Sequence, residues 1–366
     1  MAAQGYDVVF VGGGLSTMLL LSELRFVLPE RVAVIEPSPP LERPSVHWSY
    51  WSREQTLYDR FAIGVWRRAR VGDAPPEPIT PFVLRLVRST DVFAHIAALL
   101  ADTPIDWLRT SAREISRRND DLYEISTDAG TVHARWVFDS VCDIAPTFPS
   151  QGEPRGVLSG TGLRVTADRP VFDAATATLF DPLDEQSFAY LLPLSPIEAL
   201  LESASFGSDA RREDRRPLLQ YLQARHPKAH FTVTQAEWGA IPLGFAPPRT
   251  AGPRHILIGA KRGLVKPSAG YGVVRIARES EHLSRLWRED PLLPTGWRAP
   301  WRWRLLDKGF LLLAAQDPRL PMALLRRVMN AVPLEESLRF IDEELPPRKM
   351  AAFLPSALLA VLQRPR

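Results

Sequence analysis

The sequence predicts an α/β protein, and three observations lead to that class. A β-branched run at Asp7–Val11 passes through Gly12–Gly14 into an apolar, helix-periodic stretch at Leu15–Phe26. The letters "RVAVIE", which end at Glu36, are typical of a second strand, so a βαβ unit of the usual length is expected. Short alternating runs fill residues 151–250, which is the pattern of an antiparallel sheet.

These patterns divide the chain into three parts. We expect residues 1–150 to form a Rossmann-like domain to which residues 251–285 return, because a second strand-turn-helix pattern lies there. Residues 151–250 are expected to form an inserted antiparallel-sheet domain. From about Ser280 the pattern becomes helical with proline breaks, so residues 286–366 are expected to form a helical C-terminal region.

Prolines are dense in "EPSPPLERP" and "GDAPPEPITP". We therefore expect residues 37–81 to be mostly loop, with one short helix near Glu54–Phe61. Long loops of this kind often carry functional residues.

Composition excludes several classes of function. The 45 Lys and Arg residues are spread along the chain and nearly balanced by 42 Asp and Glu, so no nucleic acid partner is expected. Cys142 is the single cysteine, so we expect no internal disulfide and no metal site, and the reducing cytoplasm is the expected location. The first apolar run is interrupted by Gly12–Gly14 and reads as a strand, not a signal peptide, and no window reaches the roughly 20 apolar residues of a membrane span.

The first glycine turn is typical of a dinucleotide site. Glycines between a strand and a helix let the backbone approach a phosphate, and the helix N-terminus supplies free amides. Gly12 and Gly14 are therefore candidate cofactor-binding residues. Glu36 follows Gly12 by 24 residues, where an acid accepts hydrogen bonds from the adenosine ribose. Thr17 occupies the third glycine position of the motif, and a tight turn in an α/β core is the alternative interpretation.

A second glycine-rich segment favours FAD over NAD. The letters "ILIGAKRGLVKPSAGYGVVRIARESEHL" begin at Ile256, about 245 residues after the first turn, which suits a larger flavin cofactor. Two glycines permit a close approach, a proline stiffens the loop, and a further glycine precedes a helix whose N-terminal amides can face the flavin or its pyrophosphate. These candidate cofactor-binding residues are Gly259, Gly263, Pro267 and Gly270.

Eight segments carry a family resemblance. "DVVFVGGGLS" is similar to an FAD-binding start, "VHWSYW" to an H-T-W-S-F element with its histidine shifted by one place, and "EWGAIPLG" to E-x-G-x-I-P-M. "GLVKPSAGYGVVR" closely matches G-M-V-H-P-x-T-G-Y-x-V-x-R. "FAYLLPLSPIEALLESASF" falls where the family has a strand pair and an F-L-E-E-T motif. The remaining similar segments are "VLRLVRSTDVF", "WVFDSV" and "DRPVFDAATATLFD". In this order they resemble the flavin-dependent lycopene cyclases of carotenoid-producing bacteria and plants, within the flavin hydroxylase-like fold.

The resemblance implies an FAD-dependent cyclase that needs reduced flavin, with NAD(P)H as the electron donor, although cyclisation of its polyene substrate is net redox-neutral. Residues 151–250 would then be the substrate domain. The task is to protonate an alkene and shelter a carbocation from water, and a carboxyl in an apolar site keeps its proton for this purpose. Glu202 falls on the family's first essential glutamate and is the catalytic residue that we expect; a solvated strand residue is the alternative.

Other residues near these motifs have two interpretations. Asp181 and Glu237 serve either chemistry or structural hydrogen bonding. Trp48, Tyr50 and Trp51 either line a cation pocket or simply pack. His47 has no metal partner at ligand spacing and is given no role.

Four residues depart from the family pattern. Ser203 and Ala204 replace the second glutamate and the threonine, Lys266 replaces a histidine, and Ala269 replaces a threonine. We expect these changes to fall in or near the site. A cyclase acting on another polyene or a terpenoid is therefore an open interpretation, as are a flavin-dependent monooxygenase or other oxidoreductase and a non-catalytic carrier of a lipid-like ligand.

A polyene substrate dissolves in membranes, so peripheral association at the inner face of the membrane is expected. The stretches "MALLRRVMNAVPLEESLRFIDEEL" and "MAAFLPSALLAVLQRPR" alternate apolar faces with arginines, as a peripheral helix would. An amphipathic core helix is the equal alternative.

Overall fold

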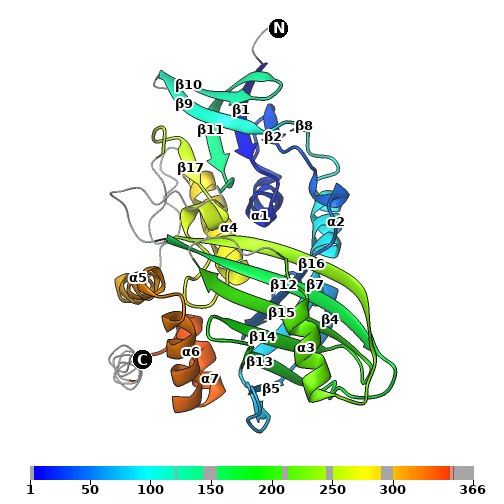
Figure 1. Ribbon diagram of the computed structural model, residues 1–366. Helices are drawn as coiled ribbons and strands as arrows, with labels where there is room; N and C mark the ends of the chain where they lie inside the picture. Colours follow the sequence, from blue (N-terminus) through cyan, green and yellow to red (C-terminus); the bar gives the residue numbers. More distant parts are fainter. Residues whose placement is uncertain are drawn as a thin grey trace.

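The computed structural model describes residues 4–119, 122–142, 155–207, 213–244, 250–289, 300–346 and 349. In Figure 1 a first sheet lies at the top, a second sheet lies below it, and helices α1, α2 and α4 lie between them. The predicted α/β class is confirmed. The helices are α1 Leu15–Leu24, α2 Ser89–Leu99, α3 Arg216–Arg225, α4 Val273–Glu289, α5 Trp301–Gln316, α6 Leu320–Ala331 and α7 Leu334–Ile341.

The first sheet has the strand order β8-β2-β1-β11-β10-β9, with β17 beside β11. The β1 strand pairs in parallel with β2 and β11, whereas β11, β10 and β9 form an antiparallel meander. Val8 and Phe10 pack in the core cluster that contains α1, and Val9 packs on the opposite face beside Ile125. Both faces of β1 are covered, which explains its near-continuous apolar sequence. The strands are β1 Gln4–Val11, β2 Val32–Ile35, β8 Ile105–Leu108, β9 Ala112–Asn119, β10 Leu122–Thr127, β11 Gly130–Asp139 and β17 His255–Leu257.

The second sheet has the order β16-β12-β15-β14-β13-β5-β6. Its strands pair antiparallel except for β13 with β5. Helix α3 covers the outer face, where Leu218 and Leu222 are fully buried. The inner face is turned towards the first sheet and helps to form the candidate site. The strands are β5 Arg68–Val71, β6 Glu77–Pro78, β12 Arg155–Ala167, β13 Thr176–Pro182, β14 Ser187–Pro193, β15 Glu198–Gly207 and β16 Phe231–Gly244.

The expectation that residues 37–81 are mostly loop misses four strands, although more than half of the segment lies outside them. The segment contains β5, β6 and two strands of a third sheet, whose order is β3-β7-β4. The helix expected at Glu54–Phe61 is only a short 3-10 turn, η2, at Asp59–Phe61. The prolines lie between strands, and the aromatic residues between them have high strand propensity. The third sheet consists of β3 His47–Ser52, β4 Ala62–Trp66 and β7 Val83–Arg88; two further 3-10 turns are η1 Pro40–Glu42 and η3 Gly259–Arg262.

Helices α6 and α7 decide between a peripheral helix and a core helix for the first of the two C-terminal stretches, residues 322–345. Met322, Leu325, Leu334 and Leu338 are all buried and belong to the main core cluster. This amphipathic pattern therefore belongs to core helices, and the last stretch, residues 350–366, lies outside the described residues. Over the described ranges, no helix combines the length and apolarity needed to cross a membrane.

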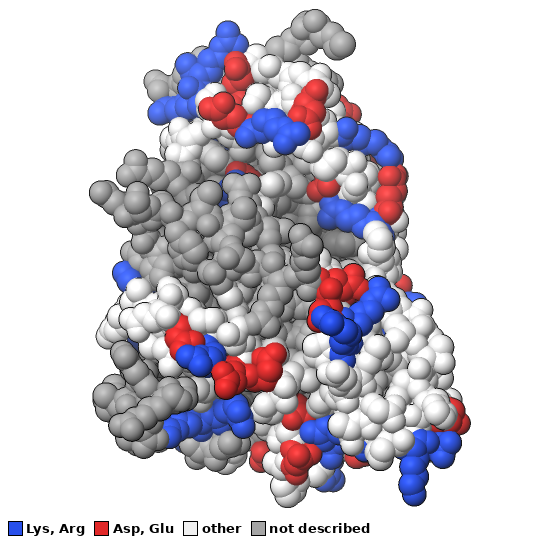
Figure 2. Space-filling view, in the orientation of Figure 1, with Lys and Arg blue, Asp and Glu red and all other residues white. Residues whose placement is uncertain are grey.

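Charged side chains on the face drawn in Figure 2 lie as neighbouring basic and acidic groups, with no single basic stripe across the view. Ion pairs of this kind in the structure include Arg113 with Asp128 at 2.5 Å and Arg169 with Asp168 at 3.0 Å. Exposed pairs contribute little to stability. The charge of the surface is therefore locally balanced on this face.

Candidate functional site

A cavity of about 420 Å³ lies where the two large sheets and β3 meet. Both glycine-rich segments reach it, through Gly14 from the first and Gly270 from the second, and Glu202 lines it from β15. The volume is within the usual range for small-molecule sites. No Lys, Arg or Asp lines it among the residues that the structure describes. The cavity therefore brings together two predicted cofactor segments and the predicted acid in a weakly charged space.

Two helix N-termini border this cavity. Leu15 and Ser16 begin α1, Val273 begins α4, and all three residues line the cavity. Neither helix has an acidic residue in its first turn. Free backbone amides and the positive ends of two helix dipoles therefore favour an anionic group such as a phosphate.

The first glycine turn is closely packed. Gly12 has φ +90, and a Cβ atom there would lie 2.4 Å from the Ser140 hydroxyl, so only glycine fits. The Glu36 carboxylate accepts hydrogen bonds from the Gly13 N–H at 2.7 Å and the Ser38 N–H at 3.0 Å. It also pairs with Arg43 at 2.6 Å. Glu36 thus orders the glycine turn directly, and its contact with a ribose stays a prediction.

The second glycine segment is fastened to the first. Gly259 has φ +62, and a Cβ atom there would lie 2.5 Å from Ser16 Oγ at the start of α1. Gly263 (φ +82) approaches the backbone of β16, and Pro267 is buried behind the cavity. Gly270 has φ +67 and lies against Leu158 of β12. Of the predicted cofactor residues, Gly14 and Gly270 line the cavity, whereas the other predicted residues hold the surrounding backbone; these are Gly12, Glu36, Gly259, Gly263 and Pro267.

Aromatic side chains form part of the cavity wall. Trp51 stacks on Tyr271 with ring centroids 4.7 Å apart and planes 7° apart, and the Tyr271 hydroxyl donates to the Trp51 carbonyl. Trp48 also lines the cavity. Tyr50 does not line it; this side chain is fully buried, and its hydroxyl bonds to Thr56 and Asp59. The idea that all three predicted aromatics line the site is therefore wrong for Tyr50.

Glu202 belongs to a row of residues in register across the inner face of the second sheet. Tyr190 of β14 pairs with Glu202 of β15, Glu202 with Gly162 of β12, and Gly162 with Glu237 of β16. Directly paired residues of neighbouring strands point to the same face. Gly162 has no side chain, so nothing separates the two glutamates along this row.

The surroundings of Glu202 favour its protonated form. Loss of hydration in the cavity wall, and second the negative charge of Glu237, raise the pKa of the Glu202 carboxyl to about 8. Loss of hydration, followed by the charge of Glu202, raises the pKa of the Tyr190 hydroxyl as well. Glu202 therefore carries a proton at neutral pH, as a general acid must.

Glu237 is held by β3 of the third sheet. Its carboxylate accepts the His47 N–H, at 3.1 Å to Oε2 and 3.3 Å to Oε1, and Oε2 lies 3.1 Å from His47 Nδ1. The His47 side chain is 1% exposed. His47 was given no role from the sequence, and this contact joins residues 190 positions apart, so no local pattern could have revealed it.

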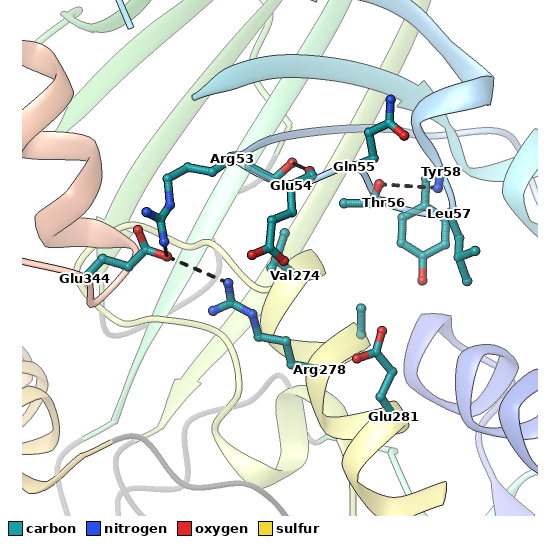
Figure 3. A pocket seen from close by; sticks show the side chains of 12 residues that line it. Arg53, Glu54, Gln55, Thr56, Leu57, Tyr58, Val274, Arg278, Glu281 and Glu344 are labelled. Carbon is teal, nitrogen blue, oxygen red and sulfur yellow. Dashed lines mark hydrogen bonds and ion pairs between the residues drawn. The ribbon is translucent and has the colours of Figure 1, made fainter. Parts of the chain in front are cut away.

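A second hollow, of about 480 Å³, lies between the Ser52–Tyr58 segment and the far side of α4. Figure 3 shows Arg53 and Arg278 both directed at Glu344; the Arg53 contact is 2.8 Å and the Arg278 contact 4.0 Å. No residue that the sequence predicts for the site lines this hollow. The first cavity is therefore the better candidate.

Comparison with known proteins agrees with the resemblance found in the sequence. The family described as "Lycopene cyclase protein" matches residues 7–359. The chain belongs to this family. No curated protein sequence matches the chain.

Solved structures with the same fold share little sequence with this lycopene cyclase family member. A geranylgeranyl bacteriochlorophyll reductase-like protein from Thermoplasma acidophilum has a TM-score of 0.57 and 14% identity, over 97% of this chain and 96% of its own. The p-nitrophenol 4-monooxygenase PnpA from Pseudomonas putida has a TM-score of 0.57 and 16% identity, over 98% of each chain. Halogenase PltM in complex with phloroglucinol and FAD has a TM-score of 0.54 and 13% identity, over 92% of this chain and 82% of its own.

The four departures from the family pattern lie in different places. Ser203, Ala204 and Ala269 all line the cavity. The Ser203 side chain follows Glu202 on the strand and so points to the outer face, where its hydroxyl bonds to the Thr161 backbone. Lys266 is 1% exposed and does not line the cavity; its side chain pairs with acids of the C-terminal region. Its carbonyl accepts the N–H groups of Ala269 and Gly270, which do line the cavity, so Lys266 lies near the site and not in it.

Asp181 also lies outside the cavity lining. Its carboxylate accepts the Tyr221 hydroxyl at 2.5 Å and pairs with Arg225 of α3. These contacts fasten α3 to the second sheet. The structural interpretation of Asp181 is therefore favoured over the chemical one.

Proposed function

We propose that the protein is an FAD-dependent cyclase that protonates an alkene of a polyene or terpenoid, with no net redox change and with Glu202 as the acid. Family membership supports the reaction class. The observation that carries the proposal is the position of Glu202, a carboxyl whose pKa is raised by loss of hydration, in an aromatic-lined cavity that both glycine-rich segments reach. Lycopene is the first substrate to test, and Ala204 and Ala269 leave room for a different one.

The residues fit FAD. The backbone at Gly14 is open, since a Cβ atom built there has no neighbour within 4 Å, and two helix N-termini border the same cavity. Gly12 and Gly14 would hold the pyrophosphate and Glu36 the ribose, whereas the segment that contains Gly259, Gly263, Pro267 and Gly270 would hold the flavin end. Bound in its reduced form, with NAD(P)H as the donor, the flavin would supply an electron-rich face that stabilises nearby positive charge.

Glu202 supplies the proton in this proposal. The proton leaves its carboxyl oxygen, the alkene π electrons form the new C–H bond, and the resulting cation is attacked by a neighbouring double bond to close the ring. Trp48, Trp51 and Tyr190 offer aromatic faces to the cation, and a wall without Lys or Arg among the described residues adds no repulsion. Loss of a proton from the ring carbon to the Glu202 carboxylate restores the acid, so atoms and electrons balance.

A Glu202→Gln variant tests this role against a matched control. Glu198 lies on the same strand, in a partly exposed ion pair with Arg164 at 2.7 Å, so Glu198→Gln makes the same substitution away from the cavity. We expect Glu202→Gln to lower turnover of lycopene in vesicles by about a hundredfold to ten-thousandfold, and Glu198→Gln to leave it near the wild-type rate. A Glu202→Gln protein that binds flavin and keeps its turnover would refute the role.

The product distinguishes the cyclase from its alternative. A cyclase gives an isomer of unchanged mass and does not consume NAD(P)H in step with turnover. A monooxygenase, as PnpA is named, would give a product one oxygen heavier and consume NAD(P)H with each turnover. The same vesicles test the proposed peripheral location on the cytoplasmic side of a membrane. Trp301 and Leu305 are exposed beside Arg304 on α5, which suits contact with a lipid surface. We therefore expect the protein to sediment with the vesicles.

A further inference from the structure

A second carboxyl group, that of Glu237, lies beside the cavity and has no part in the proposed reaction. We propose that Glu237, held by His47, is a positioning residue whose fixed negative charge keeps the Glu202 carboxyl in its acid form. The inference deepens the proposed function, since it rests on Glu202 being the acid. Glu237 does not line the cavity, so it acts through Glu202 and not on the substrate.

Gly162 is what allows the two acids to face one another. It pairs with Glu202 on one side and with Glu237 on the other, so the three residues share one face of the sheet. A Cβ atom at Gly162 would lie 2.7 Å from Glu237 Cγ and 2.9 Å from Oε1. The Glu237 side chain therefore leans over Gly162, on the side towards Glu202.

His47 fixes the position of the Glu237 carboxylate. The backbone N–H of His47 donates to both carboxylate oxygens, and Nδ1 lies within hydrogen-bond distance of Oε2. The other ring nitrogen, Nε2, is buried and has no hydrogen-bond partner within the described ranges. The His47 contacts hold the Glu237 carboxylate in place beside Gly162.

The remaining neighbours of Glu202 do not offset the charge of Glu237. Tyr190 faces it from β14, Gly162 faces it from β12 with no side chain, and the parts of α1 and α4 that line the cavity bring no charged group. The charge of Glu237 is the second largest cause that raises the pKa of Glu202, after loss of hydration. Geometry and charge thus agree on the direction of the effect.

The test measures the titration of the Glu202 carboxyl itself, in the flavin-loaded full chain. The infrared carbonyl band of a protonated carboxyl is followed with pH, and the band that disappears in Glu202→Gln is assigned to Glu202. In Glu237→Gln, whose amide oxygen can still accept the His47 N–H, we expect the midpoint of this titration to move to lower pH. Glu237→Asp keeps the charge and should stay close to wild type, and Glu198→Gln should not move the midpoint.

A purely structural role for Glu237 predicts a different result. The Gln variant would lose thermal stability while the Glu202 midpoint stayed in place, and that outcome would overturn the inference, as would an equal shift in Glu198→Gln. If Glu237→Gln does not fold, Gly162→Ala tests the same point, because its Cβ must displace the Glu237 side chain; an unmoved midpoint there also overturns it.

Activity separates this inference from the proposed function. In a cyclase the alkaline limb of the pH profile of kcat moves to lower pH in Glu237→Gln, with KM unchanged, because less of Glu202 is protonated at a given pH. A shifted infrared midpoint in a protein that converts no polyene would leave the inference standing and refute the function. An unmoved midpoint in an active cyclase would refute the inference and leave the proposed function standing.

Discussion

The Glu202 carboxyl should make the stability of the folded protein depend on pH. Its pKa is raised from an ordinary 4.5 to about 8, mainly by loss of hydration. A raised pKa means that the folded chain binds the proton more tightly than the unfolded chain does. The contribution is therefore fully present below pH 4.5, and it is lost as the pH rises towards 8.

The size of the effect follows from the shift. Each pKa unit corresponds to about 1.4 kcal/mol, so a shift of about 3.5 units amounts to roughly 5 kcal/mol as an upper figure. A Gln side chain has no such proton and nearly the same shape. Near pH 4.5, wild type and Glu202→Gln should differ little because of ionisation. Near pH 8.5, wild type should have lost several kcal/mol relative to the variant.

Urea unfolding of both proteins from pH 4.5 to 8.5, at constant ionic strength, measures this difference. Titrations of other groups cancel in the comparison, and Glu198→Gln serves as the control for loss of a strand carboxylate. A difference between wild type and Glu202→Gln that stays constant over this range would refute the reasoning. It would mean that Glu202 titrates normally and is hydrated in the folded protein.

Two further predictions concern the frame of the site. Gly270→Ala should destabilise the protein by about 2 kcal/mol or more and weaken flavin binding, because φ is +67 and the new Cβ would lie 1.9 Å from Leu158 Cδ2. Gly309→Ala in α5, with no atom within 4 Å of the new Cβ, is the control and should be neutral or slightly stabilising in thermal melts. Lys266→Met should cost about 3 to 5 kcal/mol in urea unfolding at pH 7, because Lys266 Nζ lies 3.2 Å from Asp307 in a buried cluster. The loss should shrink in acid as Asp307 becomes protonated, and a pH-independent loss would contradict this account.

Local patterns in the sequence were sufficient to predict β1, α1 and β2. Their strand, glycine turn and helix signals depend on neighbouring residues, and tertiary packing reinforces them. The Pro-rich segment 37–81 misled because its strands are short and each pairs with a distant strand, as β5 does with β13. Proline density marks where strands end, and it does not show that strands are absent.

The site also combines features that local sequence predicts with contacts between residues distant in the sequence. Glu202, Gly14 and Gly270 were predicted from motifs, and the structure brings all three to one cavity. The link between Glu237 and His47 depends on the register of β16 and on the approach of β3, neither of which is encoded locally. Such contacts require the folded arrangement of three sheets.

Strand alternation changes the meaning of the departure at Ser203. Adjacent residues of a strand point to opposite faces, so a glutamate at 203 would lie on the outer face while Glu202 faces the cavity. Ser203 also lines the cavity, but its hydroxyl bonds to the Thr161 backbone, so its side chain is turned away from that of Glu202. The acid that influences Glu202 comes from another strand, as Glu237, and it is present in this chain. The substrate question then depends on Ala204 and Ala269, whose small side chains line the cavity and widen the space in which the substrate must fold.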